Sequence, residues 1–122
     1  MIKIRKATDK DIPQIKKCLI DSWVDHAIHV PELLDEERMK KSNIEKYYSK
    51  ALNSPKTSFV IVAELDGKFA GFQRADIQKI PDFFKSNKII YLDDAYVLPE
   101  FRRKGIATVL IKEIEKIAKK NK

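Results

Sequence analysis

The 122-residue sequence predicts a single domain, residues 1–122, of the α/β (α+β) class, with a mixed, largely antiparallel sheet and flanking helices. Three observations lead to this class. Short segments with strand patterns are set between segments with helical spacing. The dipeptide Asp66-Gly67 separates two of the strand segments, which is typical of an antiparallel hairpin. Hydrophobic residues make up 43% of the chain, which suits one core and leaves no room for a second domain.

The first strand and the first helix are predicted at the N-terminus. Isoleucine alternates with lysine and arginine over residues 2–5, as in a strand with one buried face. Thr8 or Asp9 can then cap a helix. In that helix, apolar residues three and four positions apart form a stripe that faces a core: Ile12, Ile15, Leu19 and Trp23. The single cysteine, Cys18, lies in this stripe, so we expect it to be buried and unreactive.

A second helix and a hairpin follow the first helix. Residues 26–34 lose the helical periodicity, so we expect a loop there and a second helix from about residue 35 to Asn53. The run 59–63 is apolar and rich in β-branched residues, which predicts a strand covered on both faces. After the hairpin the chain returns as a strand over residues 68–76.

The last strand and the last helix complete the predicted order. Gly71 in the returning strand leaves room for another backbone or a ligand to approach closely. Beyond a loop at 81–87, residues 89–97 form the next strand, which Pro99 ends. Apolar residues then return at helical spacing at Ile106, Leu110, Ile114 and Ile117. The order is strand, helix, helix, strand, strand, strand, helix.

The turn between the last strand and the last helix, residues 97–108, is basic and contains a glycine. The first four N–H groups of a helix have no acceptor within it, and the helix dipole places about half a positive charge there. Gly105 lacks the Cβ that keeps a phosphate away from the backbone, Ala107 is small, and Thr108 offers a hydroxyl. The segment therefore predicts a pyrophosphate site.

The same residues resemble the signature of a known family. Arg102-x-x-Gly105-x-Ala107, preceded by Val97-x-Pro99, is similar to the acyl-CoA signature of the GNAT superfamily. The order of the seven elements also matches the first portion of that family, so the resemblance covers essentially the whole chain. It implies an N-acetyltransferase that transfers an acetyl group from acetyl-CoA to a primary amine of a small molecule or a protein.

The resemblance also implies where the coenzyme lies. The diphosphate of acetyl-CoA is expected on the amides of residues 103–108, and its pantetheine arm is expected beside the backbone of residues 95–97. The expected coenzyme-binding residues are Ala95, Tyr96, Val97, Arg102, Arg103, Lys104, Gly105, Ile106, Ala107 and Thr108.

The candidate catalytic residues are carboxylates, because the acceptor amine must lose a proton before it attacks a thioester. Asp93 and Asp94 lie next to the expected pantetheine contact, and only one of them can face the site unless a bulge intervenes. Asp94 matches an acidic position often seen in the family and ranks first. Glu64, at the end of an apolar strand, ranks lower. Either aspartate can equally be an ordinary solvent-facing or salt-bridged carboxylate.

The region of the first two helices bears on the acceptor pocket and on metal binding. The resemblance places the acceptor pocket there, which makes Trp23, His26 and Tyr48 candidate substrate contacts. No metal is expected, because no third nitrogen or sulfur ligand with suitable spacing accompanies His26 and His29.

The formal net charge of +7 is concentrated at the C-terminus. The last 22 residues hold eight Lys or Arg and two acids. A nucleic-acid-binding module is one alternative that this charge suggests, but no nucleic-acid motif is recognisable, so no such partner is expected. No run approaches the roughly 18 to 20 apolar residues of a membrane span and no signal peptide is visible, so we expect a cytoplasmic protein without membrane contact.

The sequence departs from the family after the last helix. Family members continue with a further strand, a helix and closing strands, which this chain lacks, so we expect an incomplete domain. The strand at 89–97 and the apolar stripe of the last helix then need cover, which predicts a homodimer or a partner chain at that sheet edge. A second alternative is a non-catalytic acyl-CoA-binding or assembly domain.

Overall fold

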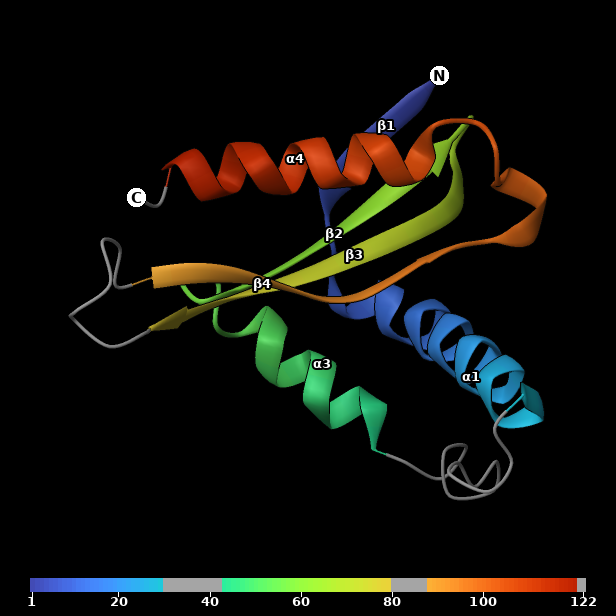
Figure 1. The fold of residues 1–122 in the computed structure, drawn as a ribbon, viewed down its shortest axis with the longest axis horizontal. Helices are drawn as coiled ribbons and strands as arrows, with labels where there is room; N and C mark the ends of the chain where they lie inside the picture. Colours follow the sequence, from blue (N-terminus) through green and yellow to red (C-terminus); the bar gives the residue numbers. More distant parts are fainter. Residues whose placement is uncertain (30–42, 80–87, 121–122) are drawn as a thin grey trace.

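The computed structural model describes residues 1–29, 43–79 and 88–120. These residues form a four-stranded antiparallel sheet in the chain order β1-β2-β3-β4. Helices α1 and α3 cover one face of the sheet, and α4 crosses the other face (Figure 1). This arrangement confirms the predicted class.

The bounds of the elements agree closely with the sequence pattern. The strands are β1 (Ile2–Lys6), β2 (Ser58–Leu65), β3 (Lys68–Lys79) and β4 (Lys88–Val97). The helices are α1 (Ile12–His29), α3 (Ile44–Leu52) and α4 (Ile106–Lys120), with short 3-10 helices η1 (Asp9–Asp11) and η2 (Pro99–Phe101). Because α1 continues to His29, the expectation that helical structure stops at residue 26 was wrong. The expected helix start near residue 35 and the loop at 81–87 lie outside the described residues.

The hairpin between β2 and β3 forms as the sequence predicts. Asp66 and Gly67 have φ angles of 54° and 81°, and two consecutive positive φ angles are what a type I′ turn requires. The strands pair on either side of this turn, starting with Leu65 opposite Lys68. The turn sets the register of the pairs beside it, and the register then shifts between Glu64 and Ala63, which lies opposite Gly71.

The sheet separates two hydrophobic cores. Val60 and Val62 of β2 face α1 and α3, whereas Ile61 and Ala63 face α4, so β2 is covered on both faces as predicted. Full burial of each large aliphatic side chain contributes about 1.5 to 3 kcal/mol. The helices supply Ile12, Ile15, Leu19 and Tyr48 to the first core and Ile106, Leu110 and Ile114 to the second.

Cys18 belongs to the first core, where it has no exposed surface. Burial, followed by the nearby charge of Asp21, raises the pKa of the Cys18 thiol to about 11. The thiol therefore stays protonated near neutral pH, in agreement with the expected buried and unreactive cysteine.

A bulge interrupts the pairing of β3 with β4. Gln73 lies opposite Ala95 and Ala75 lies opposite Leu92, so Asp93 and Asp94 together oppose the single residue Arg74. An extra residue of this kind bends the strand and redirects side chains. The sequence analysis left such a bulge open as a possibility, and it falls at the two neighbouring acids.

Gly71 lets β3 and β4 approach closely beyond the bulge. A Cβ at this position would lie 2.6 Å from the backbone oxygen of Tyr96 and 3.1 Å from the Cα of Val97. The close neighbour allowed for by the sequence is therefore the backbone of β4.

Within the described ranges, no helix combines the length and the apolar character that crossing a membrane requires.

Candidate active site

The turn from β4 to α4 depends on two residues with positive φ. Arg103 has φ 65° and Gly105 has φ 80°. This conformation is costly for residues with a Cβ and easy for glycine. A Cβ on Gly105 would meet no protein atom within 4 Å. The backbone angle at Gly105 therefore favours glycine, and the space beside it is open to a ligand.

The backbone N–H groups of residues 103–108 have no backbone acceptor within the part of the chain that the structure describes. Among the backbone hydrogen bonds of the described residues, none has a donor in this segment. The first bonded N–H group in α4 is that of Val109, which donates to the carbonyl of Gly105 at 3.1 Å. A run of such groups at the start of a 15-residue helix favours an anion.

A surface pocket of about 250 Å³ lies at this turn. It gathers most of the predicted coenzyme contacts: Val97, Arg102, Arg103, Gly105, Ile106, Ala107 and Thr108. Ala95, Tyr96 and Lys104 are not part of its lining. Phe101 does line it and was missed by the sequence analysis, where the available signal was an apolar residue inside a basic turn.

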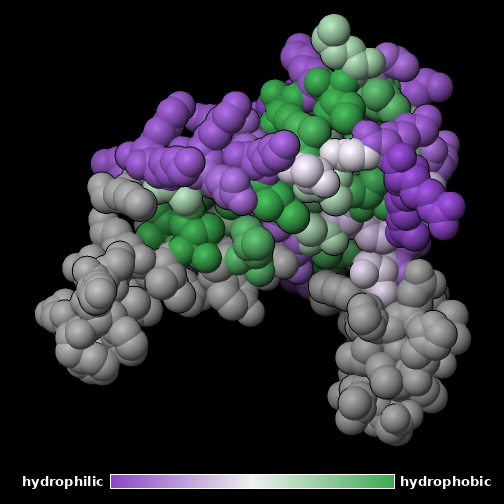
Figure 2. Space-filling model, turned by 45° about the horizontal axis from the view of Figure 1, so that its top comes forward, coloured by the Kyte–Doolittle hydropathy of each residue, from purple (hydrophilic) through white to green (hydrophobic). Residues whose placement is uncertain are grey.

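The basic side chains of the turn have different roles. Nε of Arg102 donates to the carbonyl of Val97 at 3.0 Å, and its guanidinium lies 5.3 Å from the ring centre of Tyr96. Arg102 therefore ties the turn to the end of β4. Arg103 and Lys104 are exposed cations beside the open amides. Figure 2 shows hydrophilic surface over α4 and over the turn that precedes it.

The outer edge of β4 offers further backbone groups. Leu98 donates its N–H to the carbonyl of Ala70, so this group points towards β3 at 2.9 Å. Successive strand residues direct their polar groups to opposite sides, so Val97 and Ala95 direct theirs away from β3. The bond from Arg102 to the carbonyl of Val97 agrees with this direction. An extended ligand can pair with this edge.

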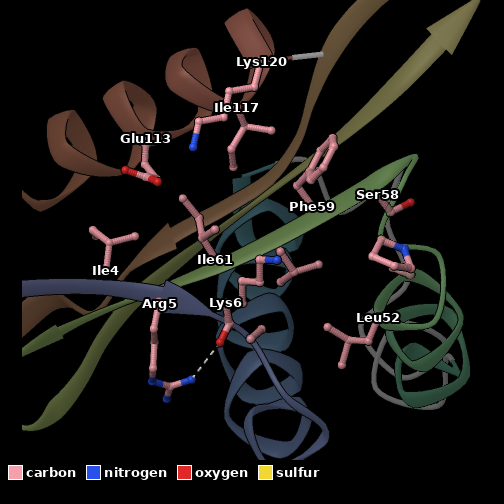
Figure 3. A pocket seen from close by; sticks show the side chains of 14 residues that line it. Ile4, Arg5, Lys6, Leu52, Ser58, Phe59, Ile61, Glu113, Ile117 and Lys120 are labelled. Atoms are coloured by element: carbon pink, nitrogen blue, oxygen red, sulfur yellow. Dashed lines mark hydrogen bonds between the residues drawn. The ribbon is translucent and has the colours of Figure 1, made fainter.

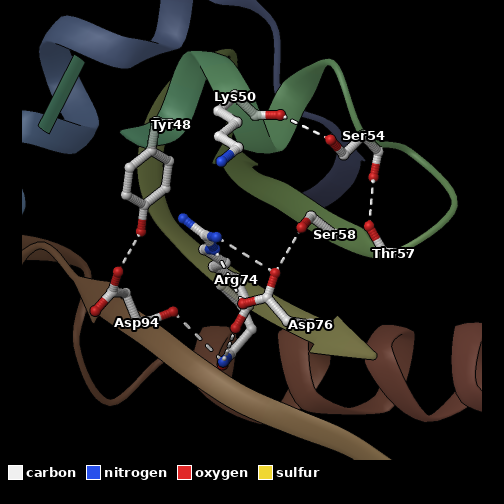
Figure 4. A network of polar contacts seen from close by, with 9 residues as sticks. Tyr48, Lys50, Ser54, Thr57, Ser58, Arg74, Asp76 and Asp94 are labelled. Atoms are coloured by element: carbon white, nitrogen blue, oxygen red, sulfur yellow. Dashed lines mark hydrogen bonds and ion pairs between the residues drawn. The ribbon is translucent and has the colours of Figure 1, made fainter. Parts of the chain in front are cut away.

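Asp94 lies at the bulge and is half-buried, with its carboxylate turned towards α3. The hydroxyl of Tyr48 donates to Oδ2 of Asp94 at 2.6 Å (Figure 4). Tyr48 has no exposed surface, so the residue predicted as a substrate contact is directed at the candidate base. On β3, Nε2 of Gln73 donates to the backbone oxygens of Asp94 at 3.5 Å and of Arg74 at 3.3 Å.

A partly buried ion pair lies beside this contact. Nε of Arg74 is 3.1 Å from Oδ2 of Asp76 (Figure 4). The other carboxylate oxygen of Asp76, Oδ1, accepts a hydrogen bond from the hydroxyl of Ser58 at 2.6 Å. The Arg74 guanidinium lies 4.0 Å from the ring centre of Tyr47 and 5.1 Å from that of Tyr48. Burial lowers the pKa of Arg74, but the hydrogen bond and charge of Asp76 outweigh it and raise that pKa overall. The sequence analysis missed this pair, although two residues spaced by two share one face of a strand.

Glu64 is held in a separate ionic cluster on the β1 side of the sheet. Its carboxylate accepts from Nε of Arg5 at 3.1 Å, and Arg5 also makes two 2.8 Å bonds to Asp11. Burial raises the pKa of Asp11, but the hydrogen bonds from Arg5 and from the N–H of Thr8 outweigh it and hold that pKa below its ordinary value. The structure therefore does not bring Glu64 together with Asp94.

Three predicted site residues have side chains outside the described part of the chain. Trp23 and His26 lie in α1, and Asp93 lies in β4, but only their backbones are described. Over the described ranges, no three His, Cys, Asp or Glu side chains gather as a metal site. The absence of a metal and the cover of the β4 edge by another chain stay predictions.

A larger pocket of about 430 Å³ lies near the end of β1 and contains none of the predicted site residues (Figure 3). Its lining is mainly apolar, with Ile61 from β2, Leu52 from α3 and Ile117 from α4. Arg5 is among the lining residues, but its guanidinium is bonded to Asp11 and Glu64. The smaller pocket is the candidate coenzyme site, because that is where the open amides are.

Comparison with known proteins agrees with the fold and the site. Residues 20–122 match the Acetyltransferase (GNAT) family. An uncharacterized N-acetyltransferase of Archaeoglobus fulgidus is 28% identical over 112 residues, which cover 92% of this chain and 70% of that protein. A predicted acetyltransferase from Clostridium acetobutylicum, solved with acetyl-CoA, has a TM-score of 0.73 at 20% identity, covering 98% of this chain and 75% of that chain. PaiA N-acetyltransferase from Thermoplasma acidophilum, solved with coenzyme A, has a TM-score of 0.70 at 25% identity, and the match covers 98% of this chain and 73% of that chain.

The fold, the open helix start and these matches define an enzyme of the acyltransferase class. The chain belongs to the GNAT family of acetyltransferases. The family resemblance read from the turn at 97–108 is thereby confirmed.

Proposed function

We propose that this protein transfers the acetyl group of acetyl-CoA to a primary amine of a small molecule or a protein. The observation that carries the proposal is the set of N–H groups at residues 103–108, beside Gly105, that have no backbone acceptor among the described residues. The structures of two similar proteins, solved with acetyl-CoA and with coenzyme A, support a coenzyme of this kind.

The coenzyme spans the turn and the edge of β4 in this proposal. Its diphosphate accepts hydrogen bonds from the amides of residues 103–108, while Arg103 and Lys104 offset its negative charge. Its pantetheine arm pairs with the outward groups of Ala95 and Val97 like a short additional strand. Because strand residues advance by about 3.3 Å each, the thioester then lies within a few residues of the bulge.

Asp94 is the proposed general base. The carboxylate takes a proton from the acceptor ammonium, directly or through a water molecule, and leaves a neutral amine. The amine nitrogen attacks the thioester carbon, so a C–N bond forms and the C–S bond breaks. The thiolate leaves with the electron pair of the C–S bond. As the amide forms, the nitrogen loses its second proton and the thiolate gains one, by exchange through solvent. The products are the amide and free coenzyme A.

The experiment that tests coenzyme binding compares two glycines in matched environments. Gly67 and Gly105 have φ angles of 81° and 80°, and an added Cβ would meet no protein atom within 4 Å at either position. Gly67→Ala and Gly105→Ala should therefore lose similar stability, about 1 to 2 kcal/mol. Thermal unfolding measures this shared cost.

Only Gly105→Ala should weaken acetyl-CoA binding in calorimetry. Loss of one or two charge-assisted amide contacts, worth about 1.5 to 3 kcal/mol each, predicts a fall in affinity of about tenfold or more. Gly67→Ala should bind as the unmodified protein does. Equal affinities for the two variants would show that the turn at Gly105 does not hold the coenzyme.

A further inference from the structure

The ring of Tyr48 is fixed in the core between α3 and the sheet. It has no exposed surface, and the rings of Phe72 and Tyr47 approach it edge-on with centroid distances of 6.1 and 5.8 Å. The hydroxyl therefore reaches Oδ2 of Asp94 from a rigid support. A separation of 2.6 Å is typical of a hydroxyl that donates to an ionised carboxylate.

Gln73 supports the backbone of the same residue from β3. Its side chain is 5% exposed, and Nε2 donates to the carbonyls of Asp94 and Arg74, the residues that face each other at the bulge. The amide carries two N–H bonds, so it can serve both carbonyls. Both distances, 3.5 and 3.3 Å, are at the long end for hydrogen bonds, so we expect the support from Gln73 to be weaker than that from Tyr48.

We propose that Tyr48 and Gln73 are positioning residues that hold Asp94 for proton transfer, Tyr48 through the carboxylate and Gln73 through the backbone of the bulge. This inference rests on the proposed function. A bulge lacks part of the regular ladder of hydrogen bonds, and a catalytic group must be held within about 0.5 Å of its productive position. The two side chains replace the missing ladder with contacts to both parts of Asp94.

The test substitutes phenylalanine for tyrosine, which removes the hydroxyl and keeps the aromatic ring. Tyr48→Phe removes the contact to Asp94, and Tyr47→Phe is the matched control, because the half-exposed Tyr47 keeps its ring over Arg74. In Tyr48→Phe we expect kcat to fall about 10- to 100-fold, as expected when general-base catalysis worth about 100- to 10,000-fold is weakened but not lost. The Kd for acetyl-CoA should not change. Tyr47→Phe should keep the kcat of the unmodified enzyme.

A double-mutant cycle separates positioning from general packing. In the Asp94→Asn background, Tyr48→Phe should cause no further loss of kcat, because the group it positions is already gone. Gln73→Met, which keeps the volume and removes the amide, should lower kcat by a smaller factor and also lose its effect in that background. Additive losses in the cycle, or an equal loss in Tyr47→Phe, would overturn the proposal.

A readout without turnover distinguishes this inference from the proposed function. The chemical shift of the Asp94 carboxyl carbon, measured by NMR at neutral pH, should change in Tyr48→Phe and stay the same in Tyr47→Phe, because only Tyr48→Phe removes the hydrogen bond to that carboxylate. An unchanged chemical shift in Tyr48→Phe would overturn the role of Tyr48 even in an active enzyme. A changed chemical shift in a protein that binds acetyl-CoA but acetylates no amine would instead count against the proposed function alone.

Discussion

The bulge in β4 and the turn that follows this strand differ in whether their polar groups are hydrogen-bonded within the protein. In the turn, the N–H groups of residues 103–108 have no backbone acceptor in residues 1–29, 43–79 and 88–120, and all but Lys104 of these residues line a surface pocket. At the bulge, the hydroxyl of Tyr48 bonds the carboxylate of Asp94, and Gln73 bonds its carbonyl. The turn is suited to receive the charge of a ligand, whereas the bulge is suited to hold a charge of the protein itself.

This difference indicates how one strand serves binding and chemistry together. Unbonded amides cost little at the surface, because water satisfies them until a ligand replaces it. A half-buried carboxylate is different, because it needs fixed partners to stay charged and in place. Substitutions at the two regions should therefore affect different measured quantities.

The largest expected effect is that of Asp94→Asn. Loss of the general base should lower kcat by about 100- to 10,000-fold. The Kd of acetyl-CoA, measured by calorimetry, should stay the same because the amides of residues 103–108 are untouched. Gly105→Ala should show the reverse pattern, with its main loss in coenzyme affinity. If Asp94→Asn weakened coenzyme binding as strongly as Gly105→Ala, the two regions would not be separate in function.

A smaller effect is expected from Gly71→Ala, between the two regions. The new Cβ would lie 2.6 Å from the backbone oxygen of Tyr96, so β4 must shift. Overpacking of this kind costs about 1 to 3 kcal/mol, which urea unfolding can measure. A tolerated Gly-to-Ala change in a strand should instead stabilise by about 0.4 to 1 kcal/mol. A stabilised variant would show that β3 and β4 are not in close contact there.

The smallest effect is expected at the ionic cluster of Arg5, Asp11 and Glu64, away from both regions. The pKa of Asp11 is lowered in the folded protein, so the unfolded chain takes up the proton at a higher pH. The contribution of Asp11 to stability is therefore complete above its ordinary pKa of about 3.9 and is lost as the pH falls below that value.

Asp11→Asn should accordingly flatten the acid limb of the stability curve and leave acetylation kinetics unchanged at neutral pH. Urea unfolding at a series of acidic pH values measures the slope. An identical slope in Asp11→Asn and the unmodified protein would show that other carboxylates govern the acid limb.

The sequence predicts the turn better than the bulge, and the reason is physical. The turn is a local structure, in which a glycine with positive φ, a proline and the first residues of a helix lie within a few positions of one another. The bulge depends on the register between β3 and β4, which pairs Gln73 with Ala95 but Ala75 with Leu92. No local pattern encodes that shift, so the sequence alone leaves open which aspartate faces which side.

The contacts of Asp94 were hidden from the sequence for the same reason. Tyr48 reaches it from a helix 46 residues earlier in the chain, so only the packing of α3 on the sheet brings the two together. The ion pair of Arg74 with Asp76 could have been predicted from the sequence in part, because residues two positions apart share one face of a strand. Helix α1 extends to His29 although its apolar stripe fades earlier, which shows that helical hydrogen bonding can outlast an amphipathic pattern.

The sheet is a partition between two separately packed layers. Side chains of α1 and α3 contact one face, and those of α4 contact the other, with alternate residues of β2 serving each layer. Substitutions on opposite faces share few neighbours, so their effects on stability should add nearly independently. The packing of one layer can therefore be altered by substitution while the opposite layer, which contains the start of α4, keeps its contacts.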